Sequence, residues 1–500
     1  MADILPFRAL RYNLAKVSAG EVLTQPYDKI TPAMQERYYQ LSPYNLARVI
    51  LGKSEAGDGE QQNVYSRAAA LLKQWQSDGV LEQDAEPSLY VYSQRFKVPG
   101  DPAGAEAERR GFIALGRVDD YANNIVFRHE QTLSKPKADR LNLLRATGAH
   151  CELIFMVYDD PADEVGKILT QDGAPTLEMR DEYGVVHRMW KVSDPATVAA
   201  ARAKMADKKL IIADGHHRYE TALNFRNEMR AKYGSGDPAY PGSPSSPGVG
   251  PDGVVEAPYE RVMIAFVNMD APGLVILPTH RVVFGLENFN IFAKAAEVMQ
   301  YFEIQDLGAI TDPQDSVPQV GKEAVPQVGE EAVPQVRPSS GLTWALDQLR
   351  DAGEDRTALL AVTAQNAFLL RARENWQAPA LKDLSEQQRR LDVVQLHKLI
   401  LEEIIGMSEE DIRAQKHLKY IRDAEEAVNE VRSGAAQIVF LMNPVRMQQV
   451  RDIAFAGEVL PQKSTDFYPK MLSGLTIYSL AAAGQSSGGD RLRSEASVSV

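Results

Sequence analysis

One stretch of the chain, residues 209–234, constrains its fold more than any other. Residues 210–213 form an apolar run of the length expected for a buried strand, and Asp214 and Gly215 end it as turn residues. Apolar side chains then recur at helical spacing over residues 219–233. The pattern predicts a strand, a tight glycine turn and a helix, as in a mixed α/β fold.

The turn in this stretch is a candidate anion site. The first backbone N–H groups of a helix have no partner within it, and together with the helix dipole they point at whatever lies beyond Gly215. His216, His217 and Arg218 add further donors at the same helix end. Phosphate is a natural occupant of such a site. The alternative is that the two histidines only cap and pack the helix.

A second polar segment, residues 125–140, follows a short apolar run and is rich in charged side chains. It can be a solvated surface, or it can be the other half of a site. In the second case His129 and Glu130 stand at a strand end, and Glu130 is the candidate general base towards a substrate hydroxyl. Lys137 or Arg140 would then neutralise phosphate charge.

Two further segments carry candidate site residues. The loop 460–470 combines Lys463, Ser464, Thr465 and Lys470 with two prolines. Cationic and hydroxyl groups on a constrained loop can clamp an anionic ligand, although a plain polar loop can carry them too. His280, between two apolar runs, is either a donor in the cleft or a structural histidine.

Other local patterns support the mixed α/β class. The sequence predicts a first strand at residues 4–12, an amphipathic helix at 64–75 and a hairpin of two strands at 89–96 and 108–117. A further strand is expected at 153–158, a helix capped by an aspartate at 194–205 and another core strand at 261–268.

Low-complexity segments suggest how the 500 residues divide into domains. Residues 234–257 are rich in Pro, Gly and Ser and are expected to be a disordered insertion, and an eight-residue repeat begins at residue 317. We therefore expect an N-terminal lobe at residues 1–306, a linker at 307–342, a C-terminal α/β lobe at 343–482 and a disordered tail at 483–500.

Composition narrows the class of protein. A formal net charge of −13 argues against nucleic acid as a partner, because nonspecific binding needs basic patches. A single cysteine, Cys151, excludes an internal disulfide framework and suits the cytosol. The N-terminus lacks the apolar core of a signal peptide, and nowhere do eighteen apolar residues run together. These features predict a cytoplasmic protein without membrane contact.

Residues 213–220, Ala-Asp-Gly-His-His-Arg-Tyr-Glu, closely resemble the signature of the bacterial and archaeal family known as domain of unknown function 1015. Many members of that family carry Pro-Pro-Tyr-Asp where this chain has Gln-Pro-Tyr-Asp, which is a small departure. The resemblance spans most of residues 1–480 and includes the segments 6–12, 26–28, 42–45, 129–140, 277–281 and 461–470.

That family is similar, at a distance, to the ParB and sulfiredoxin superfamily, which includes free serine kinases. The resemblance implies a ParB- and sulfiredoxin-like core in the N-terminal lobe. In sulfiredoxin a Gly-Cys-His-Arg loop at a helix start holds nucleotide phosphate, and residues 215–218 look like its counterpart.

The leading hypothesis is a nucleotide-dependent phosphotransferase, a small-molecule kinase, acting on a hydroxyl-bearing metabolite such as free serine. ATP or ADP with Mg²⁺ would be the cofactor, and Asp214 would bind the magnesium ion. Catalysis would rest on Glu130, His129 and His217. The cofactor-binding residues would be Asp214, Gly215, His216, His217, Arg218, Lys137, Arg140, Lys463, Ser464 and Thr465. The alternative is a ParB-like nucleotide-binding switch or a partner-binding module without turnover.

Overall fold

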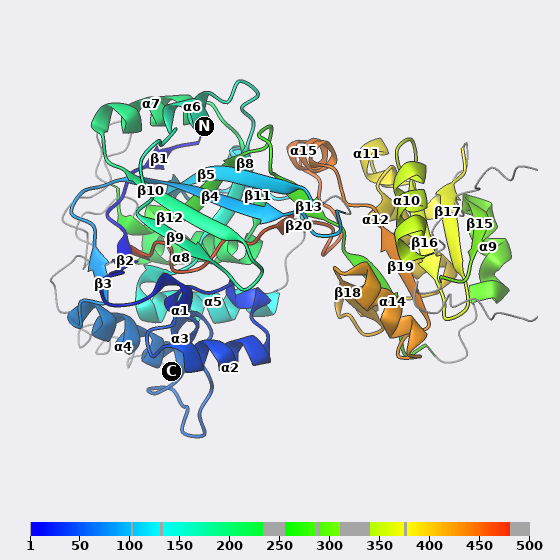
Figure 1. The fold of residues 1–500 in the computed structure, drawn as a ribbon, viewed down its shortest axis with the longest axis horizontal. Coiled ribbons are helices and arrows are strands. Elements are labelled where there is room, and N and C mark those ends of the chain that lie inside the picture. Colours follow the sequence, from blue (N-terminus) through cyan, green and yellow to red (C-terminus); the bar gives the residue numbers. More distant parts are fainter. Residues whose placement is uncertain are drawn as a thin grey trace, which may run out of the picture. The chain divides into compact units, whose positions relative to one another are not determined.

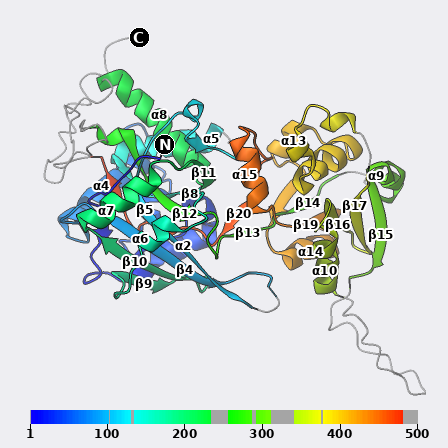
Figure 2. The same ribbon diagram turned by 90° about the horizontal axis from the view of Figure 1, so that it is seen from above.

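The computed structural model describes residues 2–101, 104–130, 134–233, 256–286, 291–310, 341–374 and 378–480. The chain divides into two compact units, shown in Figures 1 and 2. The first unit comprises residues 1–275 and 467–500, and the second comprises residues 276–466. The chain leaves the first unit within β13 (Val275–Leu277) and returns to it within β20 (Asp466–Tyr468).

A nine-stranded mixed sheet forms the centre of the first unit. Its strands run in the order β6-β11-β8-β12-β5-β4-β10-β9, and β1 pairs with β5 off this path. The β11–β6 and β12–β8 pairs are parallel, whereas the other pairs are antiparallel. The strands are β1 (Ile4–Leu5), β4 (Leu89–Lys97), β5 (Glu106–Arg117), β6 (Val126–Phe127), β8 (Ile154–Tyr158), β9 (Leu177–Arg180), β10 (Val186–Val192), β11 (Leu210–Asp214) and β12 (Arg261–Asn268).

Helices cover both faces of this sheet, with α6 and α7 on one face and α1 to α5 on the other in Figure 1. The helices are α1 (Ala19–Val22), α2 (Pro32–Leu41), α3 (Ala47–Ile50), α4 (Val64–Ser77), α5 (Ser134–Thr147), α6 (Glu164–Ile168), α7 (Pro195–Met205) and α8 (His216–Tyr233). Two small sheets pair β2 (Leu10–Tyr12) with β3 (Leu81–Gln83) and β7 (Ala149–His150) with β21 (Tyr478–Ser479).

The central strands β8, β11 and β12 are buried along almost their whole length. Strands covered on both faces read as continuous apolar runs, which explains why residues 210–213 alternate so little. Phe112, Met156, Ile212 and Phe266 belong to the resulting core cluster.

Several predicted elements are confirmed. The helix from Val64 begins after Asn63, whose side chain accepts hydrogen bonds from the first-turn N–H groups of Tyr65 and Ser66. Asp194 caps α7 by accepting from the backbone N–H of Thr197, and β4 and β5 form the expected antiparallel pair. The expected strand 4–12 is instead two short strands on either side of Pro6, which cannot donate a ladder hydrogen bond.

The second unit is built on a six-stranded antiparallel sheet in the order β15-β17-β16-β19-β14-β18. These strands are β14 (His280–Val283), β15 (Phe302–Gly308), β16 (Ala358–Val362), β17 (Ala367–Ala372), β18 (Leu418–Ile421) and β19 (Ile438–Met442). The helices are α9 (Ala295–Tyr301), α10 (Leu342–Ala352), α11 (Glu386–Arg389), α12 (Asp392–Gln395), which continues as a π-helix over Leu396–Ile404, α13 (Glu409–Arg413), α14 (Ala424–Arg432) and α15 (Met447–Phe455).

The mixed α/β class is thus confirmed, but the compact units differ from the expected lobes. Residues 276–306 belong to the second unit, because β14 lies between β19 and β18 and β15 pairs with β17. The predicted boundary is misplaced because the repeat segment lies between β15 and β16 of one sheet, and in the sequence such an insertion resembles a linker between domains. Residues 467–480 belong to the first unit. The expected insertion 234–257, linker 307–342 and tail 483–500 fall wholly or mostly outside the described residues.

None of the helices in the described part of the chain combines the length and the apolar character needed to cross a membrane.

Candidate functional site

The corner between β11 and α8 is built as the sequence predicts. Gly215 has φ +91°, and the helix begins at the next residue. A Cβ atom on Gly215 would lie 3.0 Å from the Arg218 guanidinium. Glycine is therefore required here both by the backbone conformation and by the close approach of Arg218.

Asp214, the last residue of β11, is held between two cations. Its Oδ2 lies 2.5 Å from Nη2 of Arg218, and its Oδ1 lies 3.0 Å from Nζ of Lys470. Burial by itself would raise the pKa of Asp214, but Lys470 and Arg218 outweigh it and hold the pKa well below its usual range. The carboxylate is therefore ionised at neutral pH, and Arg218 also donates to the carbonyl of Leu153.

Two histidines from distant segments meet beside this corner. The ring centroids of His129 and His216 lie 4.9 Å apart in an edge-to-face arrangement. His129 Nδ1 lies 2.7 Å from the carbonyl oxygen of Ile212, so that nitrogen carries the proton and donates it. Burial lowers the pKa of His129 to about 4 and, together with His129, lowers that of His216 well below its ordinary value. Both imidazoles are therefore neutral at pH 7.

His216 has an open hydrogen-bonding position. Its side chain belongs to the first residue of α8, and the residue is 8% exposed. Within the described ranges, its Nε2 atom has no hydrogen-bond partner. A buried polar atom normally has a partner, which marks this nitrogen as a position where a ligand or a water molecule is expected.

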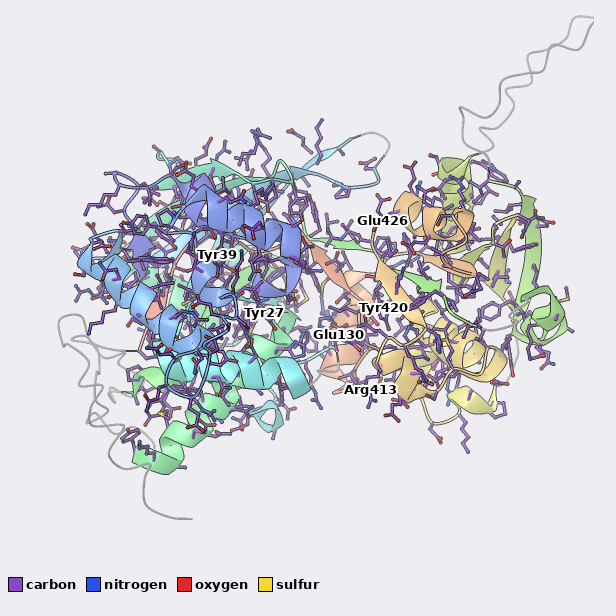
Figure 3. All side chains as sticks on the ribbon, turned by 90° about the horizontal axis from the view of Figure 1, so that it is seen from below. Tyr27, Tyr39, Glu130, Arg413, Tyr420 and Glu426 are labelled. Atoms are coloured by element: carbon purple, nitrogen blue, oxygen red, sulfur yellow. The ribbon has the colours of Figure 1, made fainter. Side chains whose placement is uncertain are left out.

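The predicted catalytic residues come from the segments that this contact joins. Glu130 follows His129 directly, so their Cα atoms are about 3.8 Å apart, and the Glu130 side chain is half-buried. His217 is the second residue of α8 and is also half-buried. Figure 3 labels Glu130 together with Tyr27 of the same unit. The motif at 129–130 and the motif at 214–218 therefore share one location.

Arg140 belongs to a buried network next to this location. Its guanidinium carbon lies 4.1 Å from the centroid of the Tyr27 ring, and its Nη1 lies 3.4 Å from Oε2 of Glu152. The backbone N–H of Tyr27 donates to the other oxygen of Glu152 at 3.0 Å. The Pro-Tyr-Asp motif near the N-terminus thus contacts the motif that ends at Arg140. Lys137, the other predicted phosphate ligand of that motif, forms an ion pair with Glu220 of α8.

Three residues are central to this arrangement in ways that the sequence did not predict. Lys470 was noted in its loop but not expected to pair with Asp214, while Tyr27 and Glu152 had no predicted site role. Lys470 and Tyr27 could have been found from the family motifs that contain them. Glu152 stands next to Cys151 with no pattern around it, and only the fold shows its place.

Three predicted cofactor-binding residues, Lys463, Ser464 and Thr465, belong to the second unit, whereas the α8 corner belongs to the first. Nη2 of Arg281 donates to the Lys463 carbonyl at 3.1 Å, and Ser464 Oγ donates to the carbonyl of Pro461. These contacts shape the loop. His280 of the same unit is buried, and its Nδ1 accepts from the backbone N–H of Met442 at 3.2 Å, as expected of a structural histidine.

The described residues contain no group of three or more His, Cys, Asp or Glu side chains that could hold a metal ion. Both carboxylate oxygens of Asp214 contact cations. Magnesium at Asp214 therefore stays a prediction, and no contact among the described residues supports it.

Comparison with known structures finds several similar chains, and three of them illustrate the range. The first is a conserved hypothetical protein from Pyrococcus furiosus, with 12% identity, a TM-score of 0.29, and coverage of 69% of this chain and 87% of that one. The second is a free serine kinase in complex with AMP, with 12% identity, a TM-score of 0.31, and coverage of 70% and 89%. The third is SbnI from Staphylococcus aureus, truncated at its C-terminus, with 10% identity, a TM-score of 0.30, and coverage of 76% and 92%. At these scores, no property of those proteins transfers to this chain.

No curated protein matches the chain. The family described as "Protein of unknown function (DUF1015)" matches residues 4–394, which span the α8 corner and the segment containing His129 and Glu130. The chain belongs to this family.

Proposed function

We propose that the α8 corner binds the phosphate groups of a nucleotide, and that the first unit transfers the terminal phosphoryl group to the hydroxyl of a small metabolite. One observation carries the proposal: the buried Nε2 of His216, without a partner in the described part of the chain, lies at the N-terminus of an 18-residue helix. The N–H groups of a helix start and an imidazole that can donate a hydrogen bond lie together here, and this combination favours the binding of a phosphate oxygen.

The charges near the corner also favour an anion. Lys470 and Arg218 share the carboxylate of Asp214, so these three groups together keep one positive charge. Gly215 has no side chain, which lets the backbone approach a ligand closely. A neutral His216 costs less to bury than a charged one, and with its hydrogen on Nε2 it donates to a phosphate oxygen.

The proposed reaction uses Glu130 as the base. As the substrate oxygen attacks the terminal phosphorus, Glu130 accepts the hydroxyl proton and a new oxygen–phosphorus bond forms. The bond between that phosphorus and the bridging oxygen breaks, and the nucleotide leaves one phosphate shorter. Phosphoryl transfer depends mainly on positioning and charge neutralisation, which His217 and the α8 N–H groups would supply. ATP or ADP is the proposed donor, and free serine is one candidate acceptor.

The test is thermal unfolding of the full chain with ATP, ADP, CTP or pyrophosphate. A ligand at a hundred times its dissociation constant stabilises the fold by about 2.7 kcal/mol. We expect the ligand to raise the melting temperature of the wild type but not that of His216→Leu. The control is His150→Leu, which should keep the rise: His150 belongs to the same unit, and desolvation also lowers its pKa, to about 4. No shift with any of the four compounds would refute the proposal.

A second measurement separates an enzyme from a binding switch. The wild-type chain, given the nucleotide that binds and serine or a related hydroxylated amino acid, should release the shortened nucleotide. Glu130→Gln should bind the nucleotide but release the shortened product at least about a hundredfold more slowly. Tight binding without turnover by the wild-type chain, across the whole set of acceptors, would replace the kinase with a nucleotide-binding switch.

A further inference from the structure

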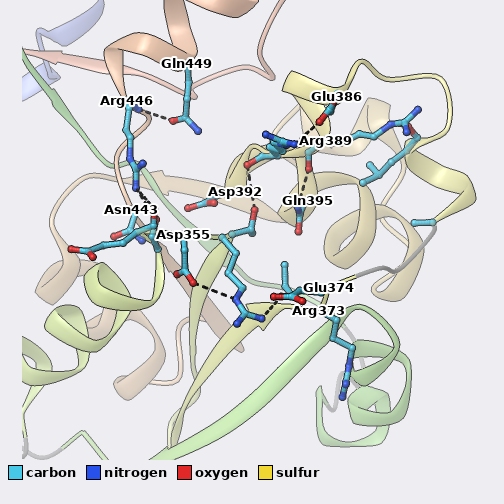
Figure 4. A pocket seen from close by; sticks show the side chains of 18 of the residues that line it. Asp355, Arg373, Glu374, Glu386, Arg389, Asp392, Gln395, Asn443, Arg446 and Gln449 are labelled. Atoms are coloured by element: carbon cyan, nitrogen blue, oxygen red, sulfur yellow. Dashed lines mark hydrogen bonds and ion pairs between the residues drawn. The ribbon is translucent and has the colours of Figure 1, made fainter.

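The second unit contains a large pocket of its own, separate in sequence from every residue proposed for phosphoryl transfer. Its volume is about 1540 Å³, which is large enough for a metabolite. It lies among the residues before β16, the end of β17, the segment from 378 to α12 and the start of α15. Figure 4 shows it from close by, with Asp392 and Gln395 between Arg446 on one side and Arg389 on the other.

A buried amide group forms part of this pocket. Gln395, the last residue of α12, is 5% exposed, and its Nε2 donates to the carbonyl of Arg389 at 2.8 Å. That bond fixes the orientation of the amide, so the other end is the oxygen. Among the residues that the structure describes, Gln395 Oε1 has no hydrogen-bond partner. A buried acceptor with no partner is expected to receive a donor from a ligand or from water.

Asp392 lies one helical turn before Gln395 and lines the same pocket. It stands at the start of α12, close to Thr357, whose Oγ1 donates to the carbonyl of Arg390 at 3.4 Å. Burial raises the pKa of Asp392 to about 7 and outweighs the opposing effects of Thr357 and Arg446. At neutral pH this carboxyl group can therefore be either the donor or the acceptor of a hydrogen bond.

Cations outnumber acids around this polar group. Six Lys or Arg and five Asp or Glu side chains line the pocket, although the chain as a whole has a net charge of −13. Nη1 of Arg356 lies 3.8 Å from Oε2 of Glu303, and its Nε lies 4.0 Å from Oδ2 of Asp355. Both distances are longer than a charge-assisted hydrogen bond. Nη2 of Arg446 donates to two backbone carbonyls, that of Gly353 at 2.8 Å and that of Glu354 at 3.3 Å. Nη1 of Arg356 also donates to the Ala372 carbonyl at 3.3 Å. None of these contacts places a carboxylate within hydrogen-bond distance of either guanidinium group, so each arginine can donate to an oxyanion.

We propose that this pocket is a second ligand site for a small phosphate- or carboxylate-bearing metabolite that also carries an amine or hydroxyl donor. Arg356 and Arg446 bind the oxyanion, and Gln395 Oε1 accepts the hydrogen bond from the donor. Thr357 and Asp392 complete the polar wall next to Gln395. The site does not depend on the phosphotransferase function of the first unit, because every residue that forms it belongs to the second.

Calorimetric titration of the full chain tests this with matched probes. Ethyl phosphate carries the oxyanion alone, and 2-aminoethyl phosphate adds the donor; propionate and β-alanine are the carboxylate counterparts. We expect the amine-bearing member of a pair to bind at least tenfold more tightly than its partner. The pair with the higher affinity identifies the natural oxyanion.

Variants assign the binding to these residues. Arg356→Gln and Arg446→Gln should each raise the dissociation constant at least tenfold, and Gln395→Leu should remove the difference within a probe pair. Arg350→Gln, at an exposed arginine of α10 outside the pocket, should leave binding unchanged. The affinity of a variant is compared with that of the wild type only if the two have the same melting temperature without ligand. If Arg356→Gln does not fold, Arg446→Gln alone tests the role of the arginines.

Three outcomes would overturn the proposal. The first is the absence of binding heat with all four probes. The second is unchanged affinity in whichever arginine variants fold. The third is binding that disappears in His216→Leu, because the probes would then occupy the α8 corner rather than the second unit.

Discussion

The Nζ atom of Lys470 lies 3.0 Å from Oδ1 of Asp214, although the two residues are 256 positions apart in the sequence. This ion pair joins the last part of the described chain to the corner between β11 and α8. Arg218 contacts the other oxygen of the same carboxylate at 2.5 Å. The pair therefore connects the folding of the C-terminal segment with the geometry of the proposed phosphate site.

Replacing Lys470 by methionine should destabilise the first unit. The side chains of Lys470 and Asp214 are 8% and 20% exposed, so the carboxylate would lose a cation in a poorly solvated place. Because Arg218 remains, we expect a loss of about 1–3 kcal/mol in the free energy of unfolding. Urea titration at pH 7 measures it. Lys204→Met is the control, because its ion pair with Glu164 is 46% exposed on both sides and an exposed pair contributes little to stability. Equal losses in the two variants would contradict the prediction.

Gly215→Ala should disturb both stability and anion binding. An L residue at φ +91° is strained, and the added Cβ would press on the Arg218 guanidinium. Gly148 is a useful control, because it also has a positive φ, +57°, but a Cβ there would meet nothing within 4 Å. We expect about 1 kcal/mol of destabilisation for Gly148→Ala from strain alone, and about 1–2 kcal/mol more for Gly215→Ala.

The same two variants also test the phosphate site. Pyrophosphate should raise the melting temperature of Gly148→Ala as it does that of the wild type. Its effect on Gly215→Ala should be much smaller, because the Cβ displaces Arg218 and narrows the approach to the α8 N–H groups. An undiminished shift in Gly215→Ala would show that the anion binds elsewhere.

His129 should make the first unit sensitive to mild acid. Its pKa is lowered to about 4 by burial, compared with about 6.5 in an unfolded chain. The unfolded state therefore binds a proton between these two pH values and the folded state does not. The stability from this group is fully present above about pH 6.5 and is lost as the pH falls towards 4, at up to about 1.4 kcal/mol per pH unit.

Unfolding free energies at pH 7.5, 6 and 5 would reveal this dependence. His129→Gln should flatten the slope between pH 6.5 and 4 by the equivalent of up to one proton. The remaining slope belongs to other histidines, including the half-buried His150, where desolvation also lowers the pKa to about 4. A slope identical to that of the wild type would mean that His129 is protonated in the folded state.

Glu130→Gln should separate binding from turnover in the proposed reaction. Removing a general base typically slows the chemical step by about 10²–10⁴-fold. The glutamine keeps the size of the side chain, so the nucleotide dissociation constant should change by less than about threefold. Single-turnover measurements with saturating nucleotide and acceptor give the rate, and titration without acceptor gives the affinity. A wild-type rate in this variant would remove Glu130 from the mechanism.

The sequence by itself determined the local elements of the site. An apolar run ended by Asp214 and Gly215, followed by helical spacing, was sufficient to predict β11, the turn and α8. The caps at Asn63 and Asp194 follow from the same short-range rules, because a cap bonds to N–H groups two or three residues away. The motifs also identified the family, which the match over residues 4–394 confirms.

Only the tertiary structure decided which of these elements meet. The contact of His129 with His216, the pairing of Lys470 with Asp214 and the place of Glu152 all depend on the order of strands in the sheet. The same holds for β14, which the sequence placed in the first lobe and the sheet places in the second unit. Local patterns report the conformation of a few neighbouring residues. Contacts across a sheet depend instead on which distant strands pair, and that choice is made by the burial of the whole core.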